Sequence, residues 1–285
     1  MKEVNRKLII NADDLGLSTG INSKIEKCIQ SGIITSSTLM ANAPCFEEGV
    51  SIAKRYPNIS VGVHLNIIEF APLTNKLVFK KHGIIGDDGC FIEGAIFHSH
   101  IDDELKTAIF EEWDAQITKI EKEGLCPSHC DSHEHTHTIK ELQDVLCGVL
   151  DKHRIMKVRR VTIPSLRLIL RQHKHYKSCD TGIEVKTIPI MRKNVLYRRI
   201  HFFIVKYISW QWNRTMAKKY SMTDAFCSFY DYLFNRDILH LKDNSSIVEI
   251  MCHPGNPHFL EETDFLVNDK SLLTDNVELI SYHNL

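Results

Sequence analysis

The chain has 285 residues, of which 43% are hydrophobic and 25% are charged. This is the composition of an ordinary globular protein, and it excludes a disordered, collagen-like or coiled-coil chain. The 35 Lys and Arg residues balance 36 Asp and Glu residues, so the net charge of -1 shows no overall bias toward nucleic acid.

Strand and helix patterns alternate along most of the chain. In chain order, the sequence predicts a strand over residues 7–10, a helix over 22–30, a Ser- and Thr-rich segment over 35–40, a helix over 46–55, a strand over 59–65, helices over 102–123 and 139–153, and strands over 156–163 and 246–252. In the longest helix Leu105, Ile109 and Trp113 recur at helical spacing. A helix between two strands returns the chain so that the strands run parallel, which predicts an α/β fold with a parallel sheet.

Residues 165–220 break this alternation. They contain thirteen Lys or Arg residues and two acidic residues, Asp180 and Glu184, so their net charge is about +11. Within them, residues 200–212 mix aromatic, aliphatic and basic side chains, which is typical of a segment that lies on anionic lipid or meets a lipid-linked sugar. The alternative is a solvated helical excursion packed on the main body. We expect no nucleic-acid binding, because no DNA- or RNA-binding motif accompanies the charge.

The cysteines and the N-terminus predict the compartment. The nine Cys residues form no CxxC pair, and a chain of this length needs no disulfides to stabilise it, which favours a reducing environment. The apolar run near the N-terminus, residues 8–10, is too short for a signal peptide or a membrane span. We therefore expect a cytoplasmic protein.

Four segments place acidic or imidazole side chains where an apolar strand gives way to a loop. These residues are Asp13 and Asp14 after the first strand, His64 at the end of the 59–65 strand, Asp131 and His133 in a histidine-rich run, and His253 after the 246–252 strand. In a parallel barrel or open α/β sheet the carboxyl ends of the strands converge on one face, which is where ligands bind. We expect these distant segments to meet there.

The residue types suggest a catalytic metal site. One carboxylate and two neutral imidazoles would hold a divalent cation and leave positions open for water and substrate. A second carboxylate beside the first would accept a proton from water, a division that suits the adjacent Asp13 and Asp14. A protonated His253 could supply a proton to a leaving group. A metal site with a base and an acid beside it is typical of a hydrolase.

Simpler interpretations exist for each motif taken alone. An Asp pair in a loop often caps a turn, and a histidine at a strand end is often a hydrogen-bonded core residue. The run from Asp131 to His137 is harder to explain by packing, because three histidines at alternating positions would lie on one face of an extended segment. A structural zinc site at Cys126, His129 and Cys130 lacks the second ligand pair of a zinc finger.

Four motifs in chain order resemble the YdjC/ChbG (HpnK-like) carbohydrate deacetylase family. They are Asn11-Ala12-Asp13-Asp14-Leu15-Gly16, Gly62-Val63-His64-Leu65-Asn66, Asp131-Ser132-His133-x-His135-x-His137 and Met251-Cys252-His253-Pro254-Gly255. The resemblance implies a (β/α) barrel-like fold related to polysaccharide deacetylases, with parallel strands and outer helices in a single domain over residues 1–285. It also implies removal of N-acetyl groups from amino sugars or oligosaccharides, a bound divalent cation, Mg²⁺ with Zn²⁺ as the alternative, and a homodimer.

The resemblance also implies roles for individual residues. Asp14, His64 and His133 correspond to the family's metal ligands, Asp13 to its catalytic base, and His253 to its late histidine, the expected acid.

An arginine near residue 158 is usual in the family, and Arg159 and Arg160 compete for that match; we choose Arg159. The departure from the family pattern is the basic insertion at about 165–220, which leaves the identity of the substrate open.

Three other functions are compatible with parts of the pattern. A metal-dependent phosphoesterase would also use Asp and His ligands, usually around two metal ions. A glycosidase would use paired carboxylates and would not need the histidine cluster. A non-catalytic relative that binds an amino sugar would need no base.

Overall fold

In the computed structural model the described residues are 6–74, 76–162, 195–235, 247–269 and 277–285. Within them, seven strands form one sheet with the order β4-β3-β2-β1-β6-β5, and β7 pairs with β1 beside this path. Every pairing is parallel. The strands are β1 (Arg6–Leu15), β2 (Ser36–Leu39), β3 (Ser60–Leu65), β4 (Cys130–Ser132), β5 (Ala225–Ser228), β6 (Ile247–Cys252) and β7 (Val277–Leu279).

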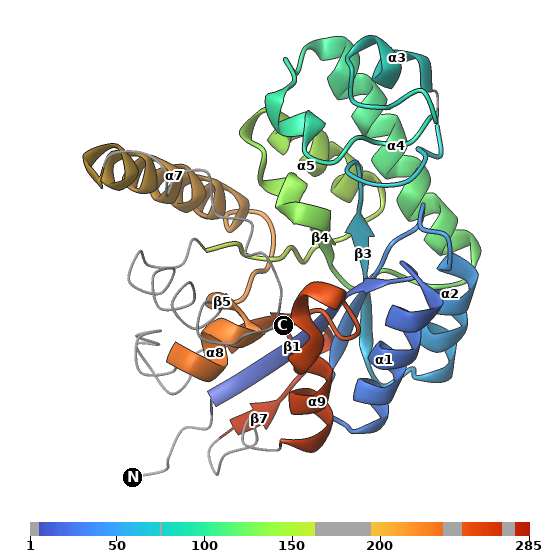
Figure 1. Cartoon of the computed structure of the whole chain (residues 1–285), viewed down its shortest axis with the longest axis vertical. Coiled ribbons are helices and arrows are strands. Elements are labelled where there is room, and N and C mark those ends of the chain that lie inside the picture. The colour runs from blue at the N-terminus through green and yellow to red at the C-terminus, as the bar shows by residue number, and fades with distance from the viewer. Residues whose placement is uncertain (1–5, 75, 163–194, 236–246, 270–276) are drawn as a thin grey trace.

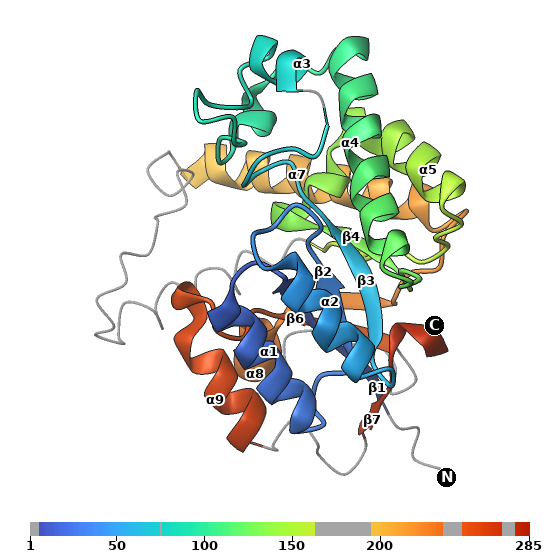
Figure 2. The same ribbon diagram turned by 90° about the vertical axis from the view of Figure 1, so that its right-hand side faces the viewer.

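Helices surround the sheet, which curls into a half-barrel (Figures 1 and 2). They are α1 (Thr19–Gln30), α2 (Phe46–Arg55), α3 (Lys76–Lys81), α4 (Asp103–Lys122), α5 (Gln143–Lys152), α7 (Val195–Met216), α8 (Phe229–Asn235) and α9 (Leu260–Asn268). This arrangement confirms the predicted α/β fold with parallel strands and outer helices.

The middle of the central strand β1 carries a continuous apolar run and lies between neighbouring strands on both sides. Leu8, Ile9 and Ile10 are completely buried, and such a continuous apolar run is typical of a parallel strand covered on both sides. Helix α4 buries its predicted stripe, including Leu105 and Trp113, and begins where the Asp102 side chain accepts a hydrogen bond from the Leu105 backbone N–H.

The predicted strand over 156–163 is reduced to two isolated parallel bridges. Val158 pairs with Cys130 of β4, and Lys157 pairs with Ser221, which lies shortly before β5. The Arg159 N–H donates to the Cys130 carbonyl oxygen at 2.9 Å, and the Cys130 N–H donates to the Lys157 carbonyl oxygen at 3.0 Å. These few bonds carry the strand pairing beyond β4 and bring residue 159 into the sheet's concave interior.

Part of the basic insertion at 165–220 lies outside the described residues. Helix α7 and the segment after it are described, and Trp212 and Met216 of α7 are buried against the body. The single-domain organisation of residues 1–285 stays a prediction. Among the helices that the structure describes, none is both long enough and apolar enough to cross a membrane.

Candidate metal and catalytic site

Two adjacent aspartates at the end of β1 both face the site. Side chains of consecutive strand residues normally point to opposite faces. Here the pairing of β1 with β2 shifts register between Ala12 and Leu15, and Asp14 adopts the left-handed conformation with φ of 68°. Aspartate tolerates this conformation better than most residues. The irregularity therefore turns the Asp13 and Asp14 carboxylates toward the same space.

Asp14 meets two histidines from other strands. Its Oδ1 lies 3.1 Å from Nδ1 of His133, which follows β4, and 3.4 Å from Nε2 of His64 at the end of β3. One ligand atom from each residue lies within 4.8 Å of the others, so the three can hold one metal ion. The structure thus brings together the three residues predicted as metal ligands.

The state of Asp14 fits a cation ligand. Burial would raise the pKa of its carboxyl, but hydrogen bonds from His133 and His64 outweigh burial and hold the pKa well below its usual range. Its Oδ2 is buried and has no hydrogen-bond partner among the described residues. A buried ionised oxygen without a partner is costly, and a divalent cation bound by one carboxylate and two imidazoles would satisfy it.

His64 is oriented by a second aspartate, Asp131 of β4. Its Nδ1 lies 2.7 Å from Asp131 Oδ1 and 3.2 Å from Thr38 Oγ1, which directs Nε2 toward Asp14. Burial would lower the pKa of His64, but Asp131 and its neighbours raise it to about 10. The surroundings therefore stabilise a positive charge at this point. A carboxylate behind a ligating histidine is the usual support of a metal site.

Arg159 is completely buried at the centre of three carboxyl groups. Its Nη1 and Nη2 each lie 2.6 Å from an oxygen of Asp13, Nη1 lies 2.7 Å from Asp131 Oδ2, and Nε donates to Glu249 Oε1 at 2.7 Å. Burial would raise the pKa of Asp13, but Arg159 outweighs burial and holds it well below its usual value. The neighbouring Arg160 instead donates to the backbone oxygen of Thr223.

A second possible ligand group, Asp13, His64 and Asp131, overlaps the first. Its two carboxylates are both already paired with the Arg159 guanidinium. A second cation there would lie beside a buried positive charge, which it would have to displace. The geometry therefore favours Asp14, His64 and His133 as the metal-binding group.

His253 stands on the more open side of Asp13. It follows β6, its Nε2 lies 4.0 Å from Asp13 Oδ2, and its side chain is 17% exposed. The imidazole stacks on Phe259, with ring centroids 4.8 Å apart. Its backbone N–H donates to the buried Glu262 carboxyl. These contacts hold the ring near Asp13 while leaving an edge accessible.

The expectation of an extended histidine run was wrong. Residues 133–138 form a 3₁₀ turn in which Glu134 and His135 adopt left-handed conformations, so the alternating histidines do not share one face. Only His133 joins the group around Asp14. His137 Nδ1 lies 2.6 Å from Ser132 Oγ, and its ring meets Trp212 of α7 edge to face, at 5.4 Å between centroids.

Sequence reasoning missed Glu249 and Tyr282. Glu249 lies in the buried strand β6, accepts a hydrogen bond from Arg159, and accepts another from the Tyr282 hydroxyl at 2.5 Å. Burial raises the pKa of Glu249 to about 7, although Arg159 and Tyr282 act in the opposite direction. A charged residue inside an otherwise apolar strand was the available signal. Tyr282 also stacks on His129, with centroids 3.6 Å apart.

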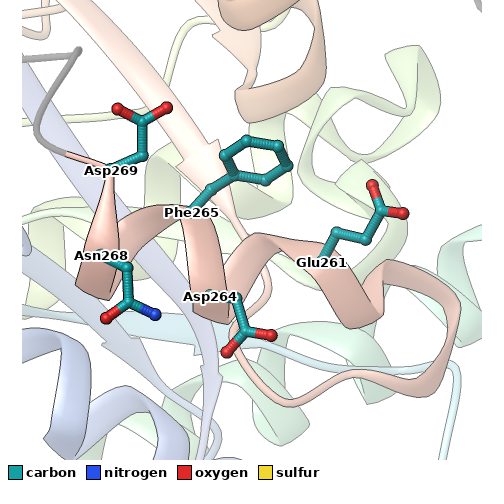
Figure 3. Close-up of a pocket in the computed structure, with 5 residues that line it drawn as sticks. All are labelled: Glu261, Asp264, Phe265, Asn268 and Asp269. Atoms are coloured by element: carbon teal, nitrogen blue, oxygen red, sulfur yellow. The ribbon is translucent and has the colours of Figure 1, made fainter.

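A surface pocket of about 490 Å³ lies on α9, apart from this site (Figure 3). Its lining residues are Glu261, Asp264, Phe265, Asn268 and Asp269. None of the residues around Asp13 and Asp14 belongs to it.

The chain is similar to known proteins in sequence and in fold. The family model described as YdjC-like protein matches residues 7–275. A carbohydrate deacetylase from Vibrio cholerae serotype O1 (strain M66-2) is 34% identical over 254 residues, which cover 87% of this chain and 78% of that relative. A carbohydrate deacetylase from Halalkalibacterium halodurans is 35% identical over 164 residues, and this match covers 52% of this chain and 61% of the relative.

Among solved structures, a candidate cellobiose-phosphate cleavage protein from Enterococcus faecalis V583 is similar over 98% of both chains. The TM-score is 0.69 and the sequence identity is 20%. This likeness shows a shared fold.

Proposed function

The chain belongs to the YdjC-like protein family, and we propose that it is a metal-dependent carbohydrate deacetylase that hydrolyses the N-acetyl group of an amino sugar or its oligosaccharide. Relatives that match most of the chain are named carbohydrate deacetylases. One observation carries the proposal. The ligand atoms of Asp14, His64 and His133 lie within 4.8 Å of one another, beside a second buried carboxylate, Asp13.

The metal-binding group would hold one divalent cation, Mg²⁺ in this proposal and Zn²⁺ as the alternative. The bound cation would polarise the acetamide carbonyl and lower the pKa of a water molecule. Asp131 keeps the His64 ring oriented through the 2.7 Å contact at Nδ1, so that Nε2 stays available on the site side. Asp14 contributes the buried oxygen that has no other partner among the described residues.

Asp13 would serve as the general base. Arg159 binds both of its oxygens, which fixes the carboxylate plane and keeps the group ionised across the neutral pH range because its pKa is held low. An ionised carboxylate held in one orientation is ready to take a proton from an attacking water. The strong pairing with Arg159 lowers the basicity of the Asp13 carboxylate, so its fixed orientation would contribute more to catalysis than its basicity.

His253 would serve as the general acid. It lies 4.0 Å from Asp13 on the more exposed side of the site, where a sugar amine would leave. Its stacking on Phe259 restricts rotation of the ring. Protonation of the amine by His253 would release a free amino sugar and acetate.

The buried charges support a cation in this site. Four acidic residues of the site, Asp13, Asp14, Asp131 and Glu249, are completely or almost completely buried, and the Arg159 guanidinium pairs with three of them. Buried charges persist when they are paired or coordinate a metal. Arg159 contacts three of these groups, and the fourth, Asp14, has among the described residues only the two histidines beside its Oδ1, so its Oδ2 is available to a cation.

A metal-dependent phosphoesterase is the alternative with related chemistry. Such enzymes often hold two metal ions bridged by carboxylates. Arg159 already pairs with the carboxylates that would hold a second ion. Elemental analysis that finds two ions per chain would favour the phosphoesterase. A non-catalytic binding relative would leave N-acetylated oligosaccharides unchanged.

The test is a screen for acetate release from N-acetylated mono-, oligo- and lipid-linked saccharides, with the full chain loaded with Mg²⁺ or Zn²⁺. We expect release from at least one class. Failure with every class, from protein shown to bind metal, would overturn the proposed activity.

Asp13→Asn tests the base. It keeps the shape of the side chain and leaves Asp14, His64 and His133 unchanged, so it should bind metal as the wild type does and lose at least about 100-fold in turnover. Turnover at the wild-type rate would show that Asp13 is not the base.

A single barrel domain over residues 1–285, a homodimer and a cytoplasmic location also belong to this proposal. Light scattering on purified protein measures the oligomeric state, and a monomer would remove the dimer from it.

A further inference from the structure

The side of α7 that faces away from the body exposes large apolar side chains. Ten large hydrophobic side chains are exposed in the described part of the chain, and five of them lie within eight consecutive positions of this helix. We call them the α7 apolar face: Phe203 (66% exposed), Ile204 (52%), Tyr207 (56%), Ile208 (40%) and Trp210 (52%). A cluster of this kind marks an interaction surface, whereas single exposed residues are ordinary.

The opposite side attaches α7 firmly to the body. Trp212 and Met216 are buried there, and Trp212 contacts His137. Asn213 Nδ2 and Ser209 Oγ both donate to the backbone oxygen of Val161, each at 2.8 Å. In Figure 1 the helix extends outward from the rest of the molecule. The α7 apolar face is therefore the outer stripe of an anchored amphipathic helix.

Charge distinguishes among the partners that could cover this face. The 22 residues of α7 include Arg198, Arg199, Lys206 and Arg214 and no Asp or Glu. The Arg214 guanidinium carbon lies 5.3 Å from the centroid of the Trp210 ring. The wider segment 165–220 has a net charge of about +11. The occupant must therefore offer negative charge around an apolar interior.

An anionic bilayer surface has both properties. Tyr and Trp favour the boundary between headgroups and acyl chains, and Lys and Arg bind anionic headgroups. A second copy of this chain would bring a second helix without acidic residues, and the like charges would repel. Nucleic acid would meet an apolar centre where it needs cationic and polar groups. The described helices are unsuited to crossing a bilayer, so α7 would lie along its surface.

We propose that α7 docks the protein on anionic membrane surfaces, with the α7 apolar face inserted among the headgroups. Trp212 links the helix to the turn that carries His133, through His137 and its contact with Ser132. Docking would therefore hold the site close to the bilayer. If the proposed function holds, the substrate class is an N-acetylated glycan attached to a lipid.

The test is co-sedimentation of the full chain with vesicles of phosphatidylcholine alone or of phosphatidylcholine with phosphatidylglycerol. Each Lys or Arg near an anionic surface contributes about 1 kcal/mol, so we expect at least about tenfold more bound protein with phosphatidylglycerol. High salt should reduce this binding. Equal sedimentation with both vesicle types, or none with either, would overturn the proposal. Binding is measured without turnover, so its outcome is separate from that of acetate release.

Paired variants test the face itself. Tyr207→Ser with Trp210→Ser should reduce binding to anionic vesicles by at least about tenfold, because it removes two interfacial aromatic groups. The matched control is Phe97→Ser with Met156→Ser, which removes two side chains of similar exposure elsewhere and should bind as the wild type does. Equal loss in both pairs would overturn the proposal. A dimer that dissociates in the first pair alone would make the face a self-interface and would also overturn it.

Discussion

Replacing Arg159 by Met should destabilise the protein strongly. Arg159 makes four short contacts to Asp13, Asp131 and Glu249 and is completely buried. Methionine fills similar space but leaves three acidic groups buried without a counter-charge. Breaking a buried ion pair by removing one partner costs about 3–5 kcal/mol. This is a large part of the roughly 5–15 kcal/mol that separates a folded protein from its unfolded state.

The free energy of unfolding that Arg159→Met loses should depend on pH. In the wild type Arg159 outweighs the effect of burial on the Asp13 carboxyl and lowers its pKa. Without Arg159, burial acts with less opposition and raises that pKa above its value in the unfolded chain. An acid whose pKa is raised on folding weakens the folded state as pH rises. The difference in free energy of unfolding between the wild type and Arg159→Met should therefore be larger at neutral pH than near pH 4.

The assay is urea unfolding followed by circular dichroism at neutral and acidic pH. Arg160→Met is the matched control, because Arg160 is half-buried and bonds to one backbone oxygen; its loss should cost about 1 kcal/mol. Arg159→Lys keeps the charge but not the fork geometry and should lie between wild type and Arg159→Met. If Arg159→Met and Arg160→Met lose the same free energy of unfolding, the buried network contributes no special stability and the reasoning fails.

Three further predictions concern other parts of the structure. Burial raises the pKa of Glu262 from 4.5 to about 8. Between these two pH values the free energy of unfolding of the wild type should fall relative to that of Glu262→Gln by roughly 1.4 kcal/mol per pH unit. Urea unfolding that gives the same pH dependence for both proteins would contradict this. A Cβ at Gly62 would lie 2.6 Å from the His129 ring and backbone oxygen, so Gly62→Ala should lower the unfolding free energy by about 1–3 kcal/mol, and an unchanged urea midpoint would contradict it. Adding Mg²⁺ at about 100 times its Kd to chelator-treated protein should raise the free energy of unfolding by about 2.7 kcal/mol, which thermal unfolding measures as a higher melting temperature. His64→Ala should abolish this increase. An equal increase in melting temperature in that variant would place the ion elsewhere.

Several features could be read from local residues because local physics determines them. The continuous apolar run at Leu8–Ile10 indicated a strand covered on both faces, and the structure buries it completely. The spacing of Leu105 and Trp113 indicated the buried stripe of α4. Polar residues that follow parallel strands must converge at one edge of the sheet. The meeting of Asp13, Asp14, His64 and His133 therefore followed from element order, whereas the choice of Asp14, His64 and His133 as the metal-binding group came from the family resemblance.

The histidine run shows where local reasoning failed. Alternation along an extended chain placed three histidines on one face, but left-handed backbone at Glu134 and His135 folds the run into a turn. His137 then packs against Trp212, about 75 positions later in the chain. Non-local contacts of this kind decide the conformation of a short polar segment, because such a segment has little propensity of its own.

The sequence by itself determined the order of strands and helices, the apolar core stripes and the types of groups at the strand ends, because each depends on neighbours in the chain. Only the tertiary structure decided which of two adjacent arginines enters the site. The backbone bonds that Lys157 and Arg159 make with Cys130 set that register, and a shift of one residue would turn Arg160 inward instead. It also decided that Glu249 has Tyr282 as a partner, because a buried charge is tolerated only where distant parts of the chain meet to satisfy it.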